Sequence, residues 1–254
     1  MQPTGNTILI TGGGSGIGRG LAEALHALGN LVIIAGRRHE VLDETTAANP
    51  GMCSLPLDIQ NAAAIRAFAG RLVDEFPTLN VVVNNAGIMR AENLLSQPTE
   101  LLDAEAIVAT NLLGPIRLTA ALLPHLEKQS NAVILNVSSG LAFLPLAFTP
   151  TYCATKAALH SYTLSLRHQL ASTGIEVIEL IPPYVQTNLM DRNADDPRAM
   201  PLDQFIAEAV EILKQQPTPA EICVETVKRL RYSAESGNFH EIFNGLNAAV
   251  ADIH

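Results

Sequence analysis

A glycine-rich turn joins the first apolar run of the chain to its first helical pattern. It reads Thr-Gly-Gly-Gly-Ser-Gly-Ile-Gly over residues 11–18, and a helix is expected over 16–28. Glycines let the backbone approach a phosphate closely, and the start of a helix offers free N–H groups and the positive end of its dipole. The spacing of Gly12, Gly16 and Gly18 is G-x-x-x-G-x-G. The turn therefore predicts a phosphate-bearing ligand, with a tight turn that holds no ligand as the alternative.

Strand-like and helix-like segments alternate along the chain. Near-continuous apolar runs are typical of strands covered on both faces, and their alternation with helices predicts a parallel sheet. We expect an α/β fold with one doubly wound parallel sheet, helices on both faces, and no domain boundary. Expected strands lie at 7–10, 31–35, 54–57, 80–83, 132–137, 175–181 and 221–225, and expected helices at 16–28, 40–48, 62–76, 99–127 (kinked at Pro115), 152–172, 202–214 and in part of the tail from 233.

The composition excludes several classes of protein. The 254 residues are 48% hydrophobic and 16% charged, with a net charge of −9. No Lys/Arg block is present, so nucleic acid is not an expected partner. Three isolated cysteines favour a reducing compartment over a disulfide framework. With neither a basic leader nor an apolar stretch of about 18 residues, we expect a cytoplasmic protein without a membrane span.

The end of the second strand carries two arginines and no acid. In dinucleotide-binding folds, an acid about 20 positions after the glycines accepts from the 2′-hydroxyl of the adenosine ribose. Here Gly36 is followed by Arg37 and Arg38. Two guanidinium groups suit a phosphate dianion, which favours NADP(H) and leaves NAD(H) possible. The alternative is solvated charge, although cations at the start of a helix are unfavourable unless something offsets them.

Tyr152 and Lys156 are four residues apart at the start of an expected helix, so they share one face. An ammonium group beside a phenol favours the phenolate and lowers the pKa of the phenol. A tyrosine tuned in this way exchanges a proton with an alcohol or a carbonyl near neutral pH. Ser139 and the Asn-Asn-Ala-Gly segment 84–87 follow expected strands, at the carboxyl edge where such sheets bind ligands. This position favours catalysis over a surface tyrosine and lysine.

Together these residues resemble the short-chain dehydrogenase/reductase family. The resemblance covers nearly the whole chain, through 11–18, 84–87, Asn111, Ser139 and 152–156. The stretch from Ser139 through the helix after it looks like the DltE-type branch of bacterial oxidoreductases. The resemblance implies a single Rossmann-type NAD(P)-binding domain over the whole chain, which transfers a hydride reversibly between NADP(H) and a carbonyl or alcohol. It also implies a homodimer or homotetramer.

The resemblance implies a role for each site residue. Tyr152 would be the general acid in reduction and the base in oxidation, and Lys156 would bind the nicotinamide ribose and tune Tyr152. Ser139 would hydrogen-bond the substrate oxygen, and Asn111 would hold a water that links Lys156 to solvent. Asp58 would contact the adenine. The implied cofactor-binding residues are Gly12, Ser15, Gly16, Ile17, Gly18, Arg37, Arg38, Asp58, Ile59, Asn84, Ala86, Gly87, Tyr152, Lys156, Pro182, Val185 and Thr187.

The chain departs from the family pattern after the sixth strand. The family has Pro-Gly where this chain has Pro182-Pro183. The second proline removes an N–H group and stiffens the loop. Apolar residues within 141–148 and 184–190 predict a mainly apolar substrate pocket, covered by a loop and helix at about 184–215. The alternative is a loop packed on its own core or on a neighbouring subunit.

Two further interpretations concern metals and other functions. His160 and His168 share one helix without an acidic partner at metal spacing, so we expect structural or surface histidines and no metal site. An NADP(H)-sensing regulatory or scaffold protein without turnover is the alternative to an oxidoreductase. A lyase or epimerase on the same fold is a third possibility, which only product analysis separates.

Overall fold

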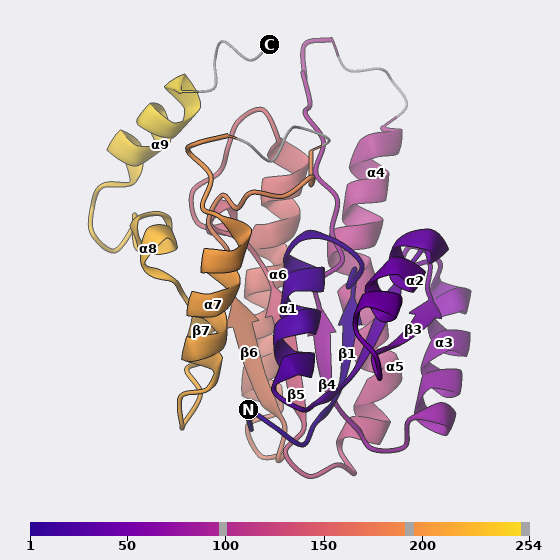
Figure 1. The fold of residues 1–254 in the computed structure, drawn as a ribbon. Helices are drawn as coiled ribbons and strands as arrows, with labels where there is room; N and C mark the ends of the chain where they lie inside the picture. Colours follow the sequence, from indigo (N-terminus) through magenta and orange to yellow (C-terminus); the bar gives the residue numbers. More distant parts are fainter. Residues whose placement is uncertain (97–100, 191–195, 250–254) are drawn as a thin grey trace.

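A computed structural model describes residues 1–96, 101–190 and 196–249. Within these residues, seven parallel strands form one sheet in the order β3-β2-β1-β4-β5-β6-β7 (Figure 1). The chain winds outward from β1 in one direction and then returns to β4 on its other side, which confirms the doubly wound α/β fold. The strands are β1 (Thr7–Thr11), β2 (Leu31–Gly36), β3 (Cys53–Pro56), β4 (Leu79–Asn84), β5 (Val133–Val137), β6 (Glu176–Leu180) and β7 (Glu221–Ile222).

Helices cover both faces of the sheet, as predicted (Figure 1). Successive residues of β1 show why: Ile8 and Ile10 join the core under α1 and α7, whereas Leu9 joins the core under α3, α5 and α6. The bounds of these helices and of α2 are α1 (Gly16–Ala27), α2 (His39–Ala48), α3 (Ala62–Glu75), α5 (Gly114–Leu126), α6 (Pro150–Gln169) and α7 (Leu202–Leu213).

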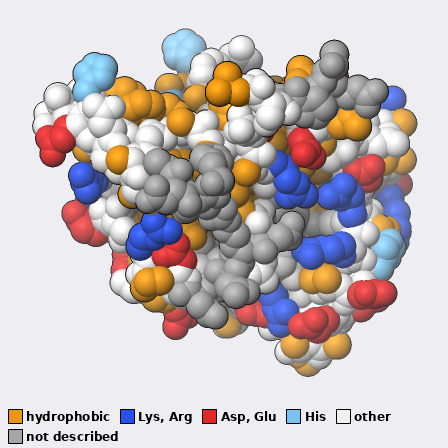
Figure 2. Space-filling view, turned by 90° about the horizontal axis from the view of Figure 1, so that it is seen from above, with side chains coloured by type: hydrophobic (Ala, Val, Ile, Leu, Met, Phe, Trp, Pro, Cys, Tyr) orange, Lys and Arg blue, Asp and Glu red, His pale blue; other side chains and the backbone are white. Residues whose placement is uncertain are grey.

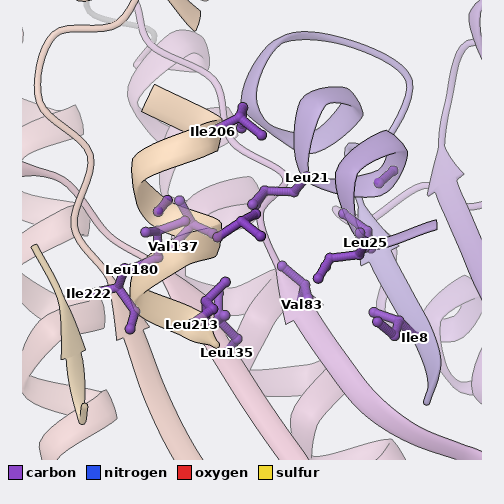
Figure 3. Close-up of a cluster of buried hydrophobic side chains, with 14 of the residues drawn as sticks. Ile8, Leu21, Leu25, Val83, Leu135, Val137, Leu180, Ile206, Leu213 and Ile222 are labelled. Carbon is purple, nitrogen blue, oxygen red and sulfur yellow. The ribbon is translucent and has the colours of Figure 1, made fainter. Parts of the chain in front are cut away.

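The core under α1 and α7 fixes the position of the first helix. Leu21 and Leu25 of α1 point toward Val83 of β4, and Leu213 of α7 lies beside Leu135 of β5 (Figure 3). Leu21 is 1% exposed and Leu25 is 3% exposed. Because α1 is anchored along its length, its N-terminus is held over the end of β1, where the glycine turn lies.

The long helix predicted over 99–127 runs without interruption from 102 to 126. A π-helical turn at 109–113 takes the place of the kink predicted at Pro115. The helix consists of α4 (Leu102–Val108), the π-helical turn η1 (Ala109–Leu113) and α5. Pro115 is the second residue of α5 and has no N–H to continue the backbone hydrogen bonds of this continuous helix, and the irregularity falls just before the proline. The predicted start at Thr99 lies outside the described residues.

The helical stretch Leu102–Leu126 corrects the expectation that no apolar stretch reaches membrane-spanning length. It has 25 residues and contains an 18-residue window with a mean hydropathy of 1.6, so it is long and apolar enough to cross a membrane by length and composition alone. Its α5 part, however, contributes the fully buried Leu118, Leu122 and Leu126 to the core under the sheet. Core helices pass the same test of length and composition, so the stretch is weak evidence for a membrane span.

The C-terminal part was predicted least completely. The strand predicted at 221–225 is reduced to the two residues of β7, and α8 (Glu225–Arg231) follows at once. Val227 is the only buried residue of this short, charged helix. The helix therefore has too weak an apolar periodicity to be predicted from the sequence. The tail contains α9 (Phe239–Ala248), which lies beyond the carboxyl edge of the sheet (Figure 1).

Candidate active site

The glycine turn lies at the carboxyl edge of the sheet, beside the reversal of strand order. A Cβ added at Gly18 would lie 2.3 Å from the Gly12 carbonyl oxygen and 2.4 Å from the Asn85 side-chain nitrogen, so only glycine fits. Gly16 has a φ of +52°, in the region that favours glycine. Ser15 precedes α1 without capping it through its side chain, and the first turn contains no acidic residue. The turn is a backbone cradle that suits an anion.

Asn85 joins the end of β4 to this cradle. Its side-chain nitrogen donates to the Thr11 carbonyl oxygen at 2.9 Å. In return, the Thr11 hydroxyl accepts from the backbone N–H groups of Asn85 and Ala86 at 3.0 and 3.1 Å. The sequence interpretation assigned no role to Thr11 or Asn85. The signal was present, since both are polar residues at the carboxyl ends of strands that flank the reversal of strand order.

The two arginines after β2 lie beside the cradle. Arg37 and Arg38 are both exposed. Arg38 Nη2 donates to the Ser15 hydroxyl at 2.9 Å, which places its guanidinium group against the start of α1. Lys and Arg side chains also gather on one side of the face seen from above (Figure 2). Two arginines therefore follow the end of β2, and one of them contacts the glycine turn.

The four predicted catalytic residues are all buried. Tyr152 and Lys156 lie on α6, and the Ser139 side chain lies close enough to the Tyr152 phenol to act on its pKa. Lys156 Nζ lies 5.7 Å from the centroid of the Tyr152 ring and donates to the Val137 carbonyl oxygen at 2.7 Å. A Cβ on Gly87 would be 3.8 Å from Lys156 Nζ and 3.5 Å from Asn111 Oδ1, so the 84–87 segment lies against Lys156 and Asn111.

The electrostatics of this group differ from the sequence prediction. Burial raises the pKa of Tyr152 to about 12, although the Ser139 side chain acts in the opposite direction. Burial also lowers the pKa of Lys156 to about 8, opposed by the negative charge of Glu179. The predicted lowering of the Tyr152 pKa by Lys156 is not found. The ammonium group is hydrogen-bonded to the Val137 carbonyl, and burial of the phenol dominates.

Asn111 lies in the π-helical turn η1, and its side chain is bonded to the backbone. Its Oδ1 accepts from the Ile88 N–H, and its Nδ2 donates to the Ile88 carbonyl oxygen, each at 2.9 Å. A further bond of 3.3 Å leads to the Thr155 hydroxyl, next to Lys156. Asn111 thus fixes the chain just after the 84–87 segment. Its predicted role in holding a water stays a prediction.

Comparison with known proteins is consistent with this geometry. The family model of the short chain dehydrogenases matches residues 6–198. This chain belongs to the short-chain dehydrogenase/reductase family. It is 40% identical over 251 residues to DltE, an uncharacterized oxidoreductase of Bacillus subtilis, with 97% of this chain and 98% of that protein covered. It is therefore a member of the DltE-like branch.

Solved structures of short-chain dehydrogenases share the fold. A 3-ketoacyl-(acyl-carrier-protein) reductase from Brucella melitensis, complexed with NADH, is 29% identical with a TM-score of 0.77, over 85% of this chain and 93% of that chain. An NADPH-bound carbonyl reductase from chicken fatty liver is 26% identical with a TM-score of 0.74, over 83% and 91%. The two resemble this chain about equally and contain different cofactors.

In this member of the short-chain dehydrogenase/reductase family, the loop after β6 packs against the turn that follows the predicted catalytic Ser139. The Pro182 carbonyl oxygen accepts from the Gly140 N–H at 2.9 Å, which connects the loop to the turn after Ser139. Val185 is buried in the core, so its backbone rather than its side chain is available to a ligand. A Cβ on Gly16 would be 3.3 Å from Thr187 Cγ2, so Thr187 lies over the glycine turn.

The structure limits what two of four other predicted cofactor residues can contribute. Ile59 is buried in the core, so only its backbone could contact a cofactor. The Asn84 side chain is also buried and donates to Asn136 Oδ1 at 2.8 Å. Asp58 is exposed, and its Oδ1 accepts from the Gln60 N–H at 3.1 Å, so its side chain remains accessible. Ile17 is half-buried at the start of α1.

Apolar side chains surround Tyr152, the predicted proton donor. Tyr152 packs in a small cluster apart from the two large cores, together with the apolar residues Met89, Ile107, Leu146, Phe148 and Cys153. Around it pack the partly buried Ile88, Leu141, Met190 and Leu246. Leu246 belongs to α9, which no sequence argument had connected with the site. Residues 191–195 of the predicted covering segment lie outside the described residues.

His160 lies beside acidic groups that its sequence neighbours do not include. Its Nδ1 lies 2.8 Å from Oε2 of Glu179, and one ligand atom from each of His160, Glu179 and Glu221 lies within 4.8 Å of the others. His160 follows Lys156 by one turn on α6. The sequence spacing did not show this cluster because the two acids come from β6 and β7, far along the chain.

Proposed function

We propose that this chain is an NADP(H)-dependent oxidoreductase that interconverts a carbonyl compound and an alcohol. One observation carries the proposal: the side chains of Ser139 and Tyr152 are buried beside Lys156 at the carboxyl edge of a dinucleotide-binding sheet. Two hydroxyl groups and one ammonium group are the donors that a carbonyl oxygen needs as it becomes an alkoxide.

The residues of this edge fit a nicotinamide dinucleotide. Any side chain at position 18 would fill the cradle between Gly12 and Gly18. The first turn of α1 contains no acidic side chain that would repel a phosphate. The cofactor supplies the hydride donor and acceptor when it is bound. The backbone of 12–18 would hold the diphosphate, Asp58 the adenine, and Lys156 with the 84–87 segment the nicotinamide ribose. Pro182, Val185 and Thr187 would contact the nicotinamide end.

Tyr152 would donate the proton to the substrate oxygen and accept it in the reverse direction. Its raised pKa, about 12, keeps the phenol protonated at neutral pH, which suits an acid in the reduction. Ser139 would share the charge that develops on the same oxygen. Lys156 has a pKa of about 8 and is therefore mostly charged at neutral pH, so it would stabilise the tyrosinate left after proton transfer.

The preference for NADP(H) is supported by the charges near β2. Arg37 and Arg38 follow its last residue, and Arg38 Nη2 lies 2.9 Å from the Ser15 hydroxyl. A guanidinium group at this distance from the cradle suits the additional phosphate of NADP(H). An acid, which would favour NAD(H), is missing from both positions after Gly36.

The substrate and setting are proposed from weaker observations. The apolar side chains around Tyr152 favour an apolar carbonyl or alcohol, covered by the segment at about 184–215. Sparse charge, at 16% of residues, supports a homodimer or homotetramer, and isolated cysteines support the cytoplasm. The whole chain would act as one domain.

Cofactor binding and turnover together test this function. NADPH and NADH titrations followed by fluorescence should show tighter binding of NADPH. A panel of ketones, aldehydes and quinones should then cause NADPH consumption, with the matching alcohols as products. Tight NADPH binding without consumption of any substrate would instead favour a sensing or scaffold protein. Tighter binding of NADH would contradict the roles of Arg37 and Arg38.

A further inference from the structure

A fully buried carboxylate lies behind the catalytic helix and has no part in the chemistry described above. Glu179 on β6 is 0% exposed and is paired in register with Asn136 of β5, whose side chain donates to Thr163 of α6. Oε2 of Glu179 is bonded to His160, whereas Oε1 has no hydrogen-bond partner within the described residues. A buried carboxylate oxygen without a partner is costly, so its position requires an explanation.

Helical spacing places Glu179 in line with the catalytic pair. Tyr152, Lys156 and His160 follow one another at four-residue intervals on α6, so they lie along one face of the helix. Glu179 contacts the last of them, at 2.8 Å from His160 Nδ1. Lys156, one turn before His160, is 4% exposed, and its ammonium group donates to the Val137 carbonyl, in the residue after Asn136. The buried anion on β6 is therefore bonded to a residue one helical turn away from the buried cation on α6.

The other charged groups near Glu179 are already paired. Arg231 of α8 donates to both carboxylate oxygens of Glu221, at 2.8 and 3.0 Å, so Glu221 carries a compensated charge. Arg231 also pairs with Glu235 at 2.8 Å. Cys223, just after β7, lies near both Glu221 and Glu179. Burial raises the pKa of its thiol to about 11, which keeps the thiol neutral. Because Arg231 occupies Glu221, His160 and Glu179 alone are an incomplete ligand set for a metal ion.

We propose that Glu179 is a positioning residue for Lys156, and that its buried carboxylate is the counter-charge that keeps the ammonium group of Lys156 protonated under α6. His160 orients the carboxylate through Nδ1 and leaves the other oxygen free to act electrostatically. The inference rests on the proposed function, in which a charged Lys156 stabilises the tyrosinate. It adds a residue that touches neither substrate nor cofactor and acts through Lys156.

The electrostatic contribution has a definite sign. Burial lowers the pKa of Lys156 to about 8, and the charge of Glu179 acts against this lowering. An opposite charge within about 4–6 Å typically shifts a pKa by one or more units. Without Glu179, the ammonium group would therefore lose its proton at a lower pH, within the range in which an enzyme works.

The direct test is a titration of Lys156 that needs neither cofactor nor turnover. The chain has four lysines, Lys128, Lys156, Lys214 and Lys228, so protein labelled with 13C at lysine Cε gives a simple NMR spectrum. The Lys156 signal is assigned by its loss in Lys156→Met. Glu179→Gln should lower the midpoint of this signal by about one pH unit. Glu176→Gln removes a carboxylate from the same strand and is the matched control, with an unchanged midpoint.

Two additions keep the test decisive. If Glu179→Gln does not fold, Glu179→Met fills a similar volume without charge and should give the same lowering. In the active enzyme, neutral variants should move the alkaline limb of kcat/KM to lower pH, and Glu179→Asp should restore it. A purely structural role would reduce the height of the profile and leave its position unchanged. An unchanged Lys156 midpoint in a folded neutral variant overturns the inference, whereas missing turnover with a shifted midpoint contradicts only the proposed function.

Discussion

The side-chain amide of Asn111 pairs with both backbone groups of Ile88. It accepts from the N–H and donates to the carbonyl oxygen, each at 2.9 Å, as a neighbouring strand would. The π-helical turn 109–113 presents this amide to the segment that follows β4. Asn111 therefore links the long helix to the backbone beside Lys156, which is a contribution independent of any water it holds.

Asn111→Ala should destabilise the protein by about 2–4 kcal/mol, because two backbone groups in a half-buried segment lose their partner. Chemical denaturation measures this change in the free energy of unfolding. Asn244→Ala, at an exposed position of α9, is the matched control and should change it by less than about 0.5 kcal/mol. A loss in Asn111→Ala no larger than in the control would show that the pair with Ile88 contributes little.

Lys156→Met should abolish turnover and stabilise the protein without cofactor. The folded-state pKa of Lys156, about 8, lies below its usual 10.5, so holding the buried ammonium group costs stability at pH 7. Its removal should increase the free energy of unfolding by roughly 1–3 kcal/mol at pH 7. The gain should shrink as the pH rises from about 8 toward 10.5, where the lysine becomes neutral in both states. Destabilisation at pH 7 would contradict the burial cost.

Arg38→Ser should weaken NADPH binding by about tenfold or more, since a charge-assisted bond to a phosphate is lost. NADH binding should change by less than about twofold, because NADH lacks that phosphate. Fluorescence titration with both cofactors measures the two effects. Arg66→Ser, at an exposed position of α3, should change neither. Equal weakening for both cofactors would assign Arg38 to the diphosphate or to the fold rather than to cofactor selection.

Gly18→Ala should destabilise the protein strongly, by about 3 kcal/mol or more, because its Cβ would lie 2.3 Å from the Gly12 carbonyl oxygen. Gly70→Ala is the control, since nothing lies within 4 Å of a Cβ there. In the exposed part of α3 this change should stabilise by about 0.5–1 kcal/mol. The two melting temperatures should move in opposite directions. A tolerated alanine at Gly18 would mean that the turn relaxes easily.

The sequence predicts the sheet, and which residues gather around Tyr152 and Lys156, because these signals are local. Apolar runs such as 7–10 and 132–137 identify the strands, and the four-residue spacing of Tyr152 and Lys156 survives in any helix. Parallel strands then bring their carboxyl ends together, so Ser139 and the 84–87 segment arrive at the same edge without further information.

Other features depend on contacts that no local pattern records. Glu179 looks like an ordinary charge in an edge-like strand, yet it is fully buried because α6 covers it. The direction of Lys156 toward the Val137 carbonyl, and the resulting pKa values, depend on packing depth. The burial of the Val185 side chain in the core, which leaves only its backbone to a ligand, also depends on packing. Leu246 joins the cluster around Tyr152 from α9, about a hundred residues further along the chain.

Proton transfer by Tyr152 is the central claim, and Tyr152→Phe tests it most directly because phenylalanine keeps the ring and removes only the hydroxyl. With a carbonyl substrate that the wild-type protein reduces, the rate of NADPH oxidation should fall by about 100-fold or more. NADPH affinity should stay within about twofold of the wild-type value, since the ring and Lys156 remain. Wild-type turnover in a folded Tyr152→Phe variant that binds NADPH would contradict the account.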